Sequence, residues 1–270
     1  MNNVLFAFGL TLFAGLSTGI GSAIAFFSKK TNTKFLSVSL GFSAGVMIYV
    51  SMIELFADAK SVLTSELGNK KGYLFTVIGF FAGMLIIALI DKLVPSMENP
   101  HQMHRVEEMG EKNSSTKLLR MGLFTALAVA IHNFPEGLAT FVASLQEPSV
   151  AIPIAVAIAI HNIPEGIAIS VPVYYATQDK KKAFLYSFLS GLSEPVGALV
   201  GYLVFMPFIN DAAFDIILGI IFAAISGIMV FISLDELLPS AEEYGEHHLS
   251  IYGLVAGMAV MAISLLLFNS

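Results

Sequence analysis

The sequence predicts an all-α polytopic membrane protein that crosses the bilayer with eight helices. Hydrophobic residues make up 56% of its 270 residues and charged residues only 13%, whereas soluble domains carry about 45–50% apolar and about 25% charged residues. The mean hydropathy is +0.79. The 14 Lys and Arg residues lie in a few short segments, which leaves uncharged stretches of about twenty residues, the length that crosses about 30 Å of hydrocarbon. This composition excludes a cytosolic enzyme.

Each expected span is a stretch of predominantly apolar residues between polar or charged segments. The first has no basic residue ahead of it and is longer than the apolar core of a signal peptide, so we expect a retained helix. The connections are short apart from one loop, which favours a single transmembrane domain over residues 1–270. The expected spans are residues 4–27, 35–57, 72–93, 118–145, 150–175, 183–208, 212–236 and 249–268, with a long loop at about 95–117.

The basic residues predict the orientation in the cell membrane. All of them except Lys60, Lys70 and Lys71 fall in the same set of alternate loops. Loops rich in Lys and Arg stay in the cytoplasm, so the long loop is expected to be cytoplasmic and both termini extracytoplasmic. No basic patch or repeat suggests a nucleic-acid partner.

The fourth and fifth spans carry the same polar motif twice, HNFPEG at residues 132–137 and HNIPEG at residues 161–166. In each copy His and Glu are four residues apart and project from one face of a helix, with Asn beside them. Ionisable residues inside a span cost several kcal/mol each and usually mark a pathway or a site. The candidate site residues in the two motifs are His132, Asn133 and Glu136, and His161, Asn162 and Glu165.

Proline adds a second feature to these spans. Pro135 and Pro164 cannot donate a hydrogen bond to the carbonyl four residues earlier, so we expect both helices to kink at the centre of the bundle. The sixth span contains Glu194 directly before another proline. Gly137 and Gly166 would let a neighbouring helix approach closely.

The depth of these groups predicts a metal site. The fourth, fifth and sixth spans are centred near residues 132, 163 and 195, so their polar groups all lie near the bilayer midplane. Three carboxylates and two imidazoles in one layer need protons or a cation to neutralise them, and no Lys or Arg lies at that depth. The chain has no Cys, so a metal would have nitrogen and oxygen ligands, which suit zinc, iron or manganese.

The doubled motif, the segment SGLSEPVG at residues 190–197 and the eight spans resemble the ZIP metal transporters, in particular their bacterial members. The long loop before the fourth span also carries histidines, His101 and His104, as in that family. The resemblance covers the whole chain. It implies uptake of zinc, and often of iron, manganese, cobalt or cadmium, into the cytoplasm through a binuclear site.

The family pattern also implies how the ligands are shared, and it implies no bound cofactor. Zinc would be held by His132, Glu136, His161 and Glu165. An adjoining site, associated with iron in this branch, would consist of Asn133, Glu136, Asn162, Glu165 and Glu194, with both motif glutamates bridging. The expected partners are divalent metal ions and the lipid bilayer, and a homodimer is the candidate assembly.

Further acidic residues suggest a path through the membrane. We expect Glu54 to receive the cation outside, and Asp91, Asp235 and Glu236 to release it inside together with loop histidines. Solvated charges at helix ends are the alternative, above all for Asp58 and Asp91. The sequence leaves open the roles of Met47, which matches a soft ligand position of certain relatives, and of His101, His104, His247 and His248.

A membrane-embedded di-metal carboxylate enzyme is the alternative function. Di-iron helical bundles use Glu-x-x-His pairs on facing helices. Here the order is His-x-x-x-Glu, and the chain contains no HExxH motif for zinc hydrolysis. The residues therefore favour a transporter over an enzyme.

Overall fold

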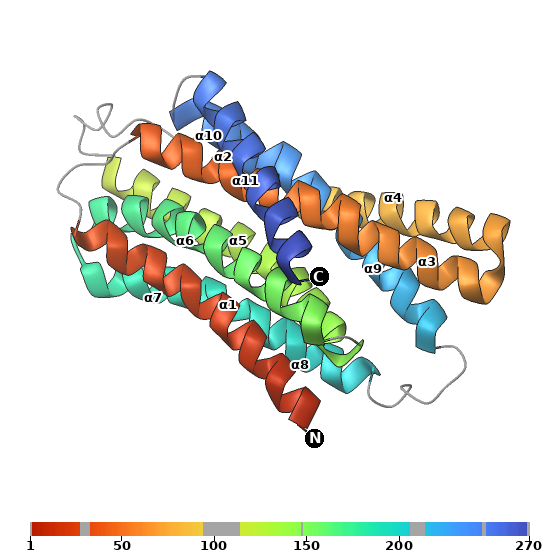
Figure 1. Ribbon diagram of the computed structural model, residues 1–270. Helices are drawn as coiled ribbons and strands as arrows, with labels where there is room; N and C mark the ends of the chain where they lie inside the picture. The colour runs from red at the N-terminus through yellow and green to blue at the C-terminus, as the bar shows by residue number, and fades with distance from the viewer. Residues whose placement is uncertain are drawn as a thin grey trace.

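The computed structural model describes residues 2–27, 33–93, 114–146, 148–205, 214–244 and 247–268, and these residues are helical apart from short turns. The all-α prediction is therefore confirmed (Figure 1). The elements are α1 (Asn2–Phe27), α2 (Thr33–Val50), η1 (Ser51–Leu55), α3 (Phe56–Leu67), α4 (Asn69–Leu93), α5 (Ser114–Gln146), α6 (Pro148–Thr177), α7 (Lys180–Gly191), α8 (Ser193–Phe205), α9 (Phe214–Ile232), η4 (Ser233–Leu237), α10 (Leu238–Tyr244) and α11 (His247–Phe268), where η1 and η4 are π-helical.

The expected spans all correspond to helices, but two of these helices continue past the expected ends. The second reaches Leu67 and the seventh reaches Tyr244, each through a π-helical segment. Charged residues lower the hydropathy of these ends, yet Ala59 and Leu63 are fully buried because α3 packs against α4 and α9. The loop expected at 95–117 lies mostly outside the described residues, and α5 already begins at Ser114.

Seven helical segments among the described residues are long and apolar enough to cross a membrane. The fourth expected span, which forms α5, is not one of them. This helix begins at Ser114, includes Lys117 and Arg120 in its first two turns, and carries the first polar motif. Large apolar side chains such as Phe81 and Leu85 on α4 are exposed, as a lipid-facing surface requires.

The helices are arranged as two bundles that lie side by side (Figure 1). Helices α1, α5, α6, α7 and α8 pack on one another and are called the motif bundle, because both polar motifs lie on α5 and α6. Helices α2, α3, α4, α9, α10 and α11 pack together as the flanking bundle. The bundles meet where α2 and α11 contact α6 and where α9 contacts α5.

Glycines bring helix backbones into contact inside each bundle. A Cβ atom at Gly137 would meet the backbone of Glu194 on α8, and one at Gly45 would meet the backbone of Leu254 on α11. Small residues permit such close helix packing in membranes. Every comparably close glycine contact among the described residues joins helices of the same bundle. Close backbone contacts at glycines therefore hold the helices of each bundle together.

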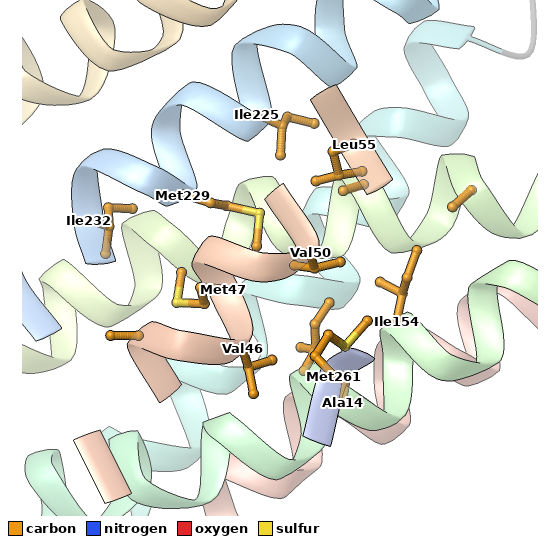
Figure 2. Packing of buried hydrophobic residues seen from close by; sticks show 14 of the residues in the cluster. Ala14, Val46, Met47, Val50, Leu55, Ile154, Ile225, Met229, Ile232 and Met261 are labelled. Atoms are coloured by element: carbon orange, nitrogen blue, oxygen red, sulfur yellow. The ribbon is translucent and has the colours of Figure 1, made fainter. Parts of the chain in front are cut away.

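Apolar side chains make the contact between the bundles. One buried cluster contains Ala14 and Ile154 from the motif bundle and Met47, Met229 and Met261 from the flanking bundle (Figure 2). Methionine side chains are flexible and fill irregular gaps. The two bundles thus meet through adaptable side chains, whereas the helices inside each bundle meet through glycine backbone.

Replacing Gly45 by Ala is expected to lower the stability of the protein. The added methyl group would meet the Leu254 backbone, and overpacking of this kind costs about 1–3 kcal/mol. Gly9→Ala is the matched control, since a Cβ there meets nothing within 4 Å, and it should melt at or above the parent temperature. Heating purified protein in detergent and following the monodisperse fraction by size exclusion measures both. Equal melting temperatures of the two variants would contradict a stabilising role of the glycine backbone contacts.

Candidate metal centre

All seven predicted site residues are buried inside the membrane-spanning bundle. Each is at most 1% exposed, and among the described residues no Lys or Arg is buried with them. Three adjoining helices supply them. They are His132, Asn133 and Glu136 on α5, His161, Asn162 and Glu165 on α6, and Glu194 on α8.

The two motifs are paired crosswise. Nε2 of His132 lies 3.2 Å from Oε2 of Glu165, and Nε2 of His161 lies 3.3 Å from Oε2 of Glu136. The sequence spacing placed each His beside the Glu of its own helix. Because α6 begins two residues after α5 ends and runs back along it, the His of one motif is level with the Glu of the other. Each motif glutamate therefore has an imidazole partner from the neighbouring helix.

Glu194 is held by a break in the sixth span. Helix α7 ends at Gly191, and α8 begins at Ser193 with Glu194 in its first turn, where the helix N-terminus favours a negative charge. The proline after Glu194 explains the break, because it cannot continue the hydrogen bonding of α7. The side-chain amide of Asn162 donates to the Glu194 carboxylate and, at 3.0 Å, to the carbonyl of Ala14 on α1.

Several oxygen atoms at the centre have no hydrogen-bond partner in the part of the chain that the structure describes. They belong to Asn133, Glu136, Asn162 and Glu194, and Asn133 also has an unpartnered amide nitrogen. Buried polar atoms without a partner cost about 1–3 kcal/mol each, so their concentration here indicates a ligand. Carbonyl and carboxylate oxygens are suitable ligands for divalent cations.

The carboxylates are not gathered around one point. Among the described residues, no group of three or more His, Asp or Glu side chains is arranged to hold a metal ion as it stands. The imidazoles and carboxylates instead contact one another in pairs. A cation entering this centre would have to replace the His–Glu contacts.

Two residues of the flanking bundle reach this centre and were not predicted to do so. Ser43 on α2 donates its hydroxyl to Oε1 of Glu165 at 3.3 Å. Oε2 of Glu236, on η4, lies 3.7 Å from Nδ1 of His132. The sequence predicts Glu236 on the release path and not at the centre. Its place in a segment, SLDEL, that resembles SMIEL of the second span is the signal that could have singled it out.

Three further candidates have other surroundings in the described residues. Glu54 is half-buried on η1 and has Asp58 as its charged neighbour. Met47 is fully buried in the apolar cluster between the bundles. His248 is exposed and stacks on Tyr252. The predictions for His101 and His104, and for the side chain of His247, lie outside the described residues.

A buried layer of His, Asn and Glu side chains inside a bundle of apolar spans is typical of multi-pass membrane proteins that move ions, the class that contains metal transporters. The family model described as ZIP Zinc transporter matches residues 92–265. The chain belongs to this family, as its two motifs predicted. It is therefore a transporter and not the di-metal enzyme considered as the alternative.

Relatives along the whole chain agree with this assignment. The chain is 65% identical to a protein named Zinc transporter ZupT from Clostridium perfringens, over 99% of this chain and 98% of that protein. It is also 65% identical to Zinc transporter ZupT from Streptococcus mutans, with 97% of each chain covered. The protein of the same name from Chlorobium luteolum is 57% identical over the full length of both chains.

Glu194→Gln is expected to leave the protein without metal as stable as the parent, or more stable. The glutamine keeps an oxygen that accepts from Asn162 and removes a buried carboxylate that no Lys or Arg neutralises in the described residues. The melting temperature in detergent with a metal chelator tests this. Glu66→Gln, at an exposed position on α3, is the control and should not change it; a marked loss at Glu194 alone would show that its charge stabilises the empty protein.

Proposed function

We propose that this chain takes up zinc into the cytoplasm through a binuclear site at the bilayer midplane. The observation that carries the proposal is the crosswise His–Glu pairing of two nearly identical motifs, buried together with unpartnered oxygens. Its relatives are named zinc transporters, which supports the choice of cation. Iron, manganese, cobalt and cadmium are further candidate substrates, because nitrogen and oxygen ligands accept all of them.

The ligands would divide into two neighbouring sets. His132, Glu136, His161 and Glu165 offer two nitrogens and two carboxylates, a set that suits tetrahedral zinc. Asn133, Asn162 and Glu194 add oxygen donors on the side where Asn162 contacts Glu194. The motif glutamates would bridge the two sets, and the unpartnered Oε1 of Glu136 supports that role.

The imidazoles of the His–Glu pairs would stabilise the motif glutamates while no cation is bound. A carboxylate buried alone is very unfavourable, so an empty transporter needs an internal partner for each motif glutamate while its site passes through the membrane. The imidazole of the opposite motif is that partner here. An arriving cation replaces both contacts at once, and its departure lets them form again.

The path to and from this site would use the acidic residues of the flanking bundle. Glu54 lies on the side proposed to face out, and Glu236 reaches the site from the side proposed to face in. Asp91 and the exposed Asp235 would follow at the cytoplasmic end. This direction rests on the positive-inside rule, which also predicts that both termini are extracytoplasmic.

Uptake of labelled zinc by purified protein in liposomes tests the proposal. Glu136→Ala and Glu165→Ala are expected to slow uptake by at least about tenfold, since each removes a ligand. Glu66→Ala, on an exposed face, should stay within about twofold of the parent, as a solvated charge does. If zinc binds to the protein but does not cross the bilayer, or if the ligand variants transport it as well as the control, the proposal fails.

The proposed division of ligands predicts a change in metal preference. Glu194→Gln is expected to reduce uptake of iron(II) and manganese more than that of zinc, by about tenfold in the ratio of rates, because hard cations depend more on carboxylate oxygen. His161→Gln should act in the opposite sense, since imidazole favours zinc. Competition between zinc and iron(II) or manganese in the same vesicles measures both ratios. Equal losses for all metals would argue for a single site.

A further inference from the structure

The second and seventh spans carry a common pattern that the two motifs do not explain. Residues 45–55 and 227–237 share Gly, Met, Ser, Glu and Leu at the same places. Four of the six remaining places exchange one β-branched or aromatic residue for a similar one. The shared glutamates are Glu54 and Glu236. The two spans are therefore copies of one unit.

Both copies have the same local structure. The stretches Ser51–Leu55 and Ser233–Leu237 are π-helical, each inside an otherwise α-helical span. In both, the Ser and the final Leu are buried and the Glu is half-buried. Single π-helical turns inside α-helices are rare and occur frequently at functional sites. The repetition of this rare feature with its Glu indicates a shared role.

The copies run in opposite directions. Ser37, at the start of α2, donates to the carbonyl of Ala241 on α10, and Ser226 on α9 donates to the carbonyl of Ser51. The pairing is antiparallel, as Figure 1 also shows. In this register Glu54 and Glu236 are separated by about twelve residues of helix, or about 18 Å. Inverted repeats of this kind allow a transporter to adopt two related conformations around one site.

The surroundings of the two glutamates differ in this conformation. Helix α9 packs against α5, and Glu236 lies 3.7 Å from Nδ1 of His132. Helix α2 packs against α6 in the corresponding way, but in the described residues Glu54 does not contact Nδ1 of His161. Neither His132 nor His161 has a hydrogen bond at Nδ1, so the difference is the 3.7 Å ion-pair contact that Glu236 makes with His132. In this conformation, therefore, only one of the two repeated glutamates contacts a motif histidine.

The register of α2 against α6 gives the size of the difference. Ser43 contacts Glu165, and the two helices run in opposite directions, so His161 lies near the level of Met47. Glu54 is seven residues farther along α2, or about 10 Å. A shift of the motif bundle by that length along α2 would bring His161 to Glu54 and withdraw His132 from Glu236.

We infer that Glu54 and Glu236 are alternating partners of the two motif histidines. Glu236 contacts Nδ1 of His132 in the present conformation, and Glu54 contacts Nδ1 of His161 in the conformation open to the other side of the membrane. Both act as positioning residues, because a carboxylate on one ring nitrogen fixes the orientation of the other nitrogen toward the cation. This inference rests on the proposed transport function and adds a role for the flanking bundle.

Cross-linking in the natural Cys-free background tests the two contacts directly. The pairs Glu236→Cys with His132→Cys and Glu54→Cys with His161→Cys are treated in liposomes with a short bifunctional thiol reagent. Both pairs are expected to link. The exchanged pairs, Glu54→Cys with His132→Cys and Glu236→Cys with His161→Cys, are the controls and should not. The inference is overturned if the Glu54 and His161 positions stay unlinked while the Glu236 and His132 positions link, or if the exchanged pairs link equally well.

Transport by single variants supplies a second test. Glu54→Gln is expected to slow zinc uptake at least about tenfold, a loss typical of a residue that orients a ligand, while equilibrium zinc binding in detergent stays unchanged because Glu54 is not at the centre in this conformation. Asp58→Asn, one turn away and exposed, is the matched control and should transport normally. Equal rates for both variants, or a loss of binding in Glu54→Gln, would contradict the inference. Cross-linking does not depend on transport. Failure of zinc uptake by the parent protein would therefore contradict the proposed function without deciding whether the two contacts alternate.

Discussion

The structure depends on the burial of carboxylates where the described part of the chain offers no buried Lys or Arg. Glu136, Glu165 and Glu194 are almost fully inaccessible, and each would be prohibitive alone. The chain solves this by duplicating one motif on two antiparallel helices, so that each motif glutamate meets the histidine of the other copy. Glu194 instead accepts a hydrogen bond from the side-chain amide of Asn162. Glycines support these contacts by permitting the close packing of α5 on α8 and of α6 on α1.

The two bundles differ in how they are held together, and this difference bears on the site. Backbone contacts at glycines leave little freedom inside a bundle, whereas methionine side chains between the bundles can repack. The motif bundle supplies all seven predicted site residues, but Ser43 and Glu236 come from the flanking bundle. Movement of one bundle past the other would therefore change the partners of the site without dismantling it.

The sequence predicted the spans and the seven buried residues because both signals are local. A polar group in an apolar stretch is visible without knowing its neighbours, and the break at Glu194 follows from its proline. The partners were not predictable in this way. Spacing placed His132 beside Glu136, but its partner is Glu165 because the relative level of two helices decides the contact. The π-helical segments and the contact of Glu236 likewise depend on packing between distant helices.

Small departures from the repeat distinguish the local structure of its two copies. In the first copy the carbonyl of Ser51 accepts both the backbone N–H of Phe56 and the hydroxyl of Ser226. Ser226 precedes the shared glycine of the second copy, and the equivalent residue of the first copy is Ala44, which has no hydroxyl to offer to Ser233. The η1 segment is therefore tied to α9 by a bond that has no counterpart at η4. A bond of this kind contributes about 1 kcal/mol. Because both of its partners lie in the flanking bundle, it stiffens η1 in either arrangement of the two bundles and favours neither arrangement. The balance between the two conformations is therefore set by the contacts that change when the bundles move, such as those of Ser43 and Glu236 with the site.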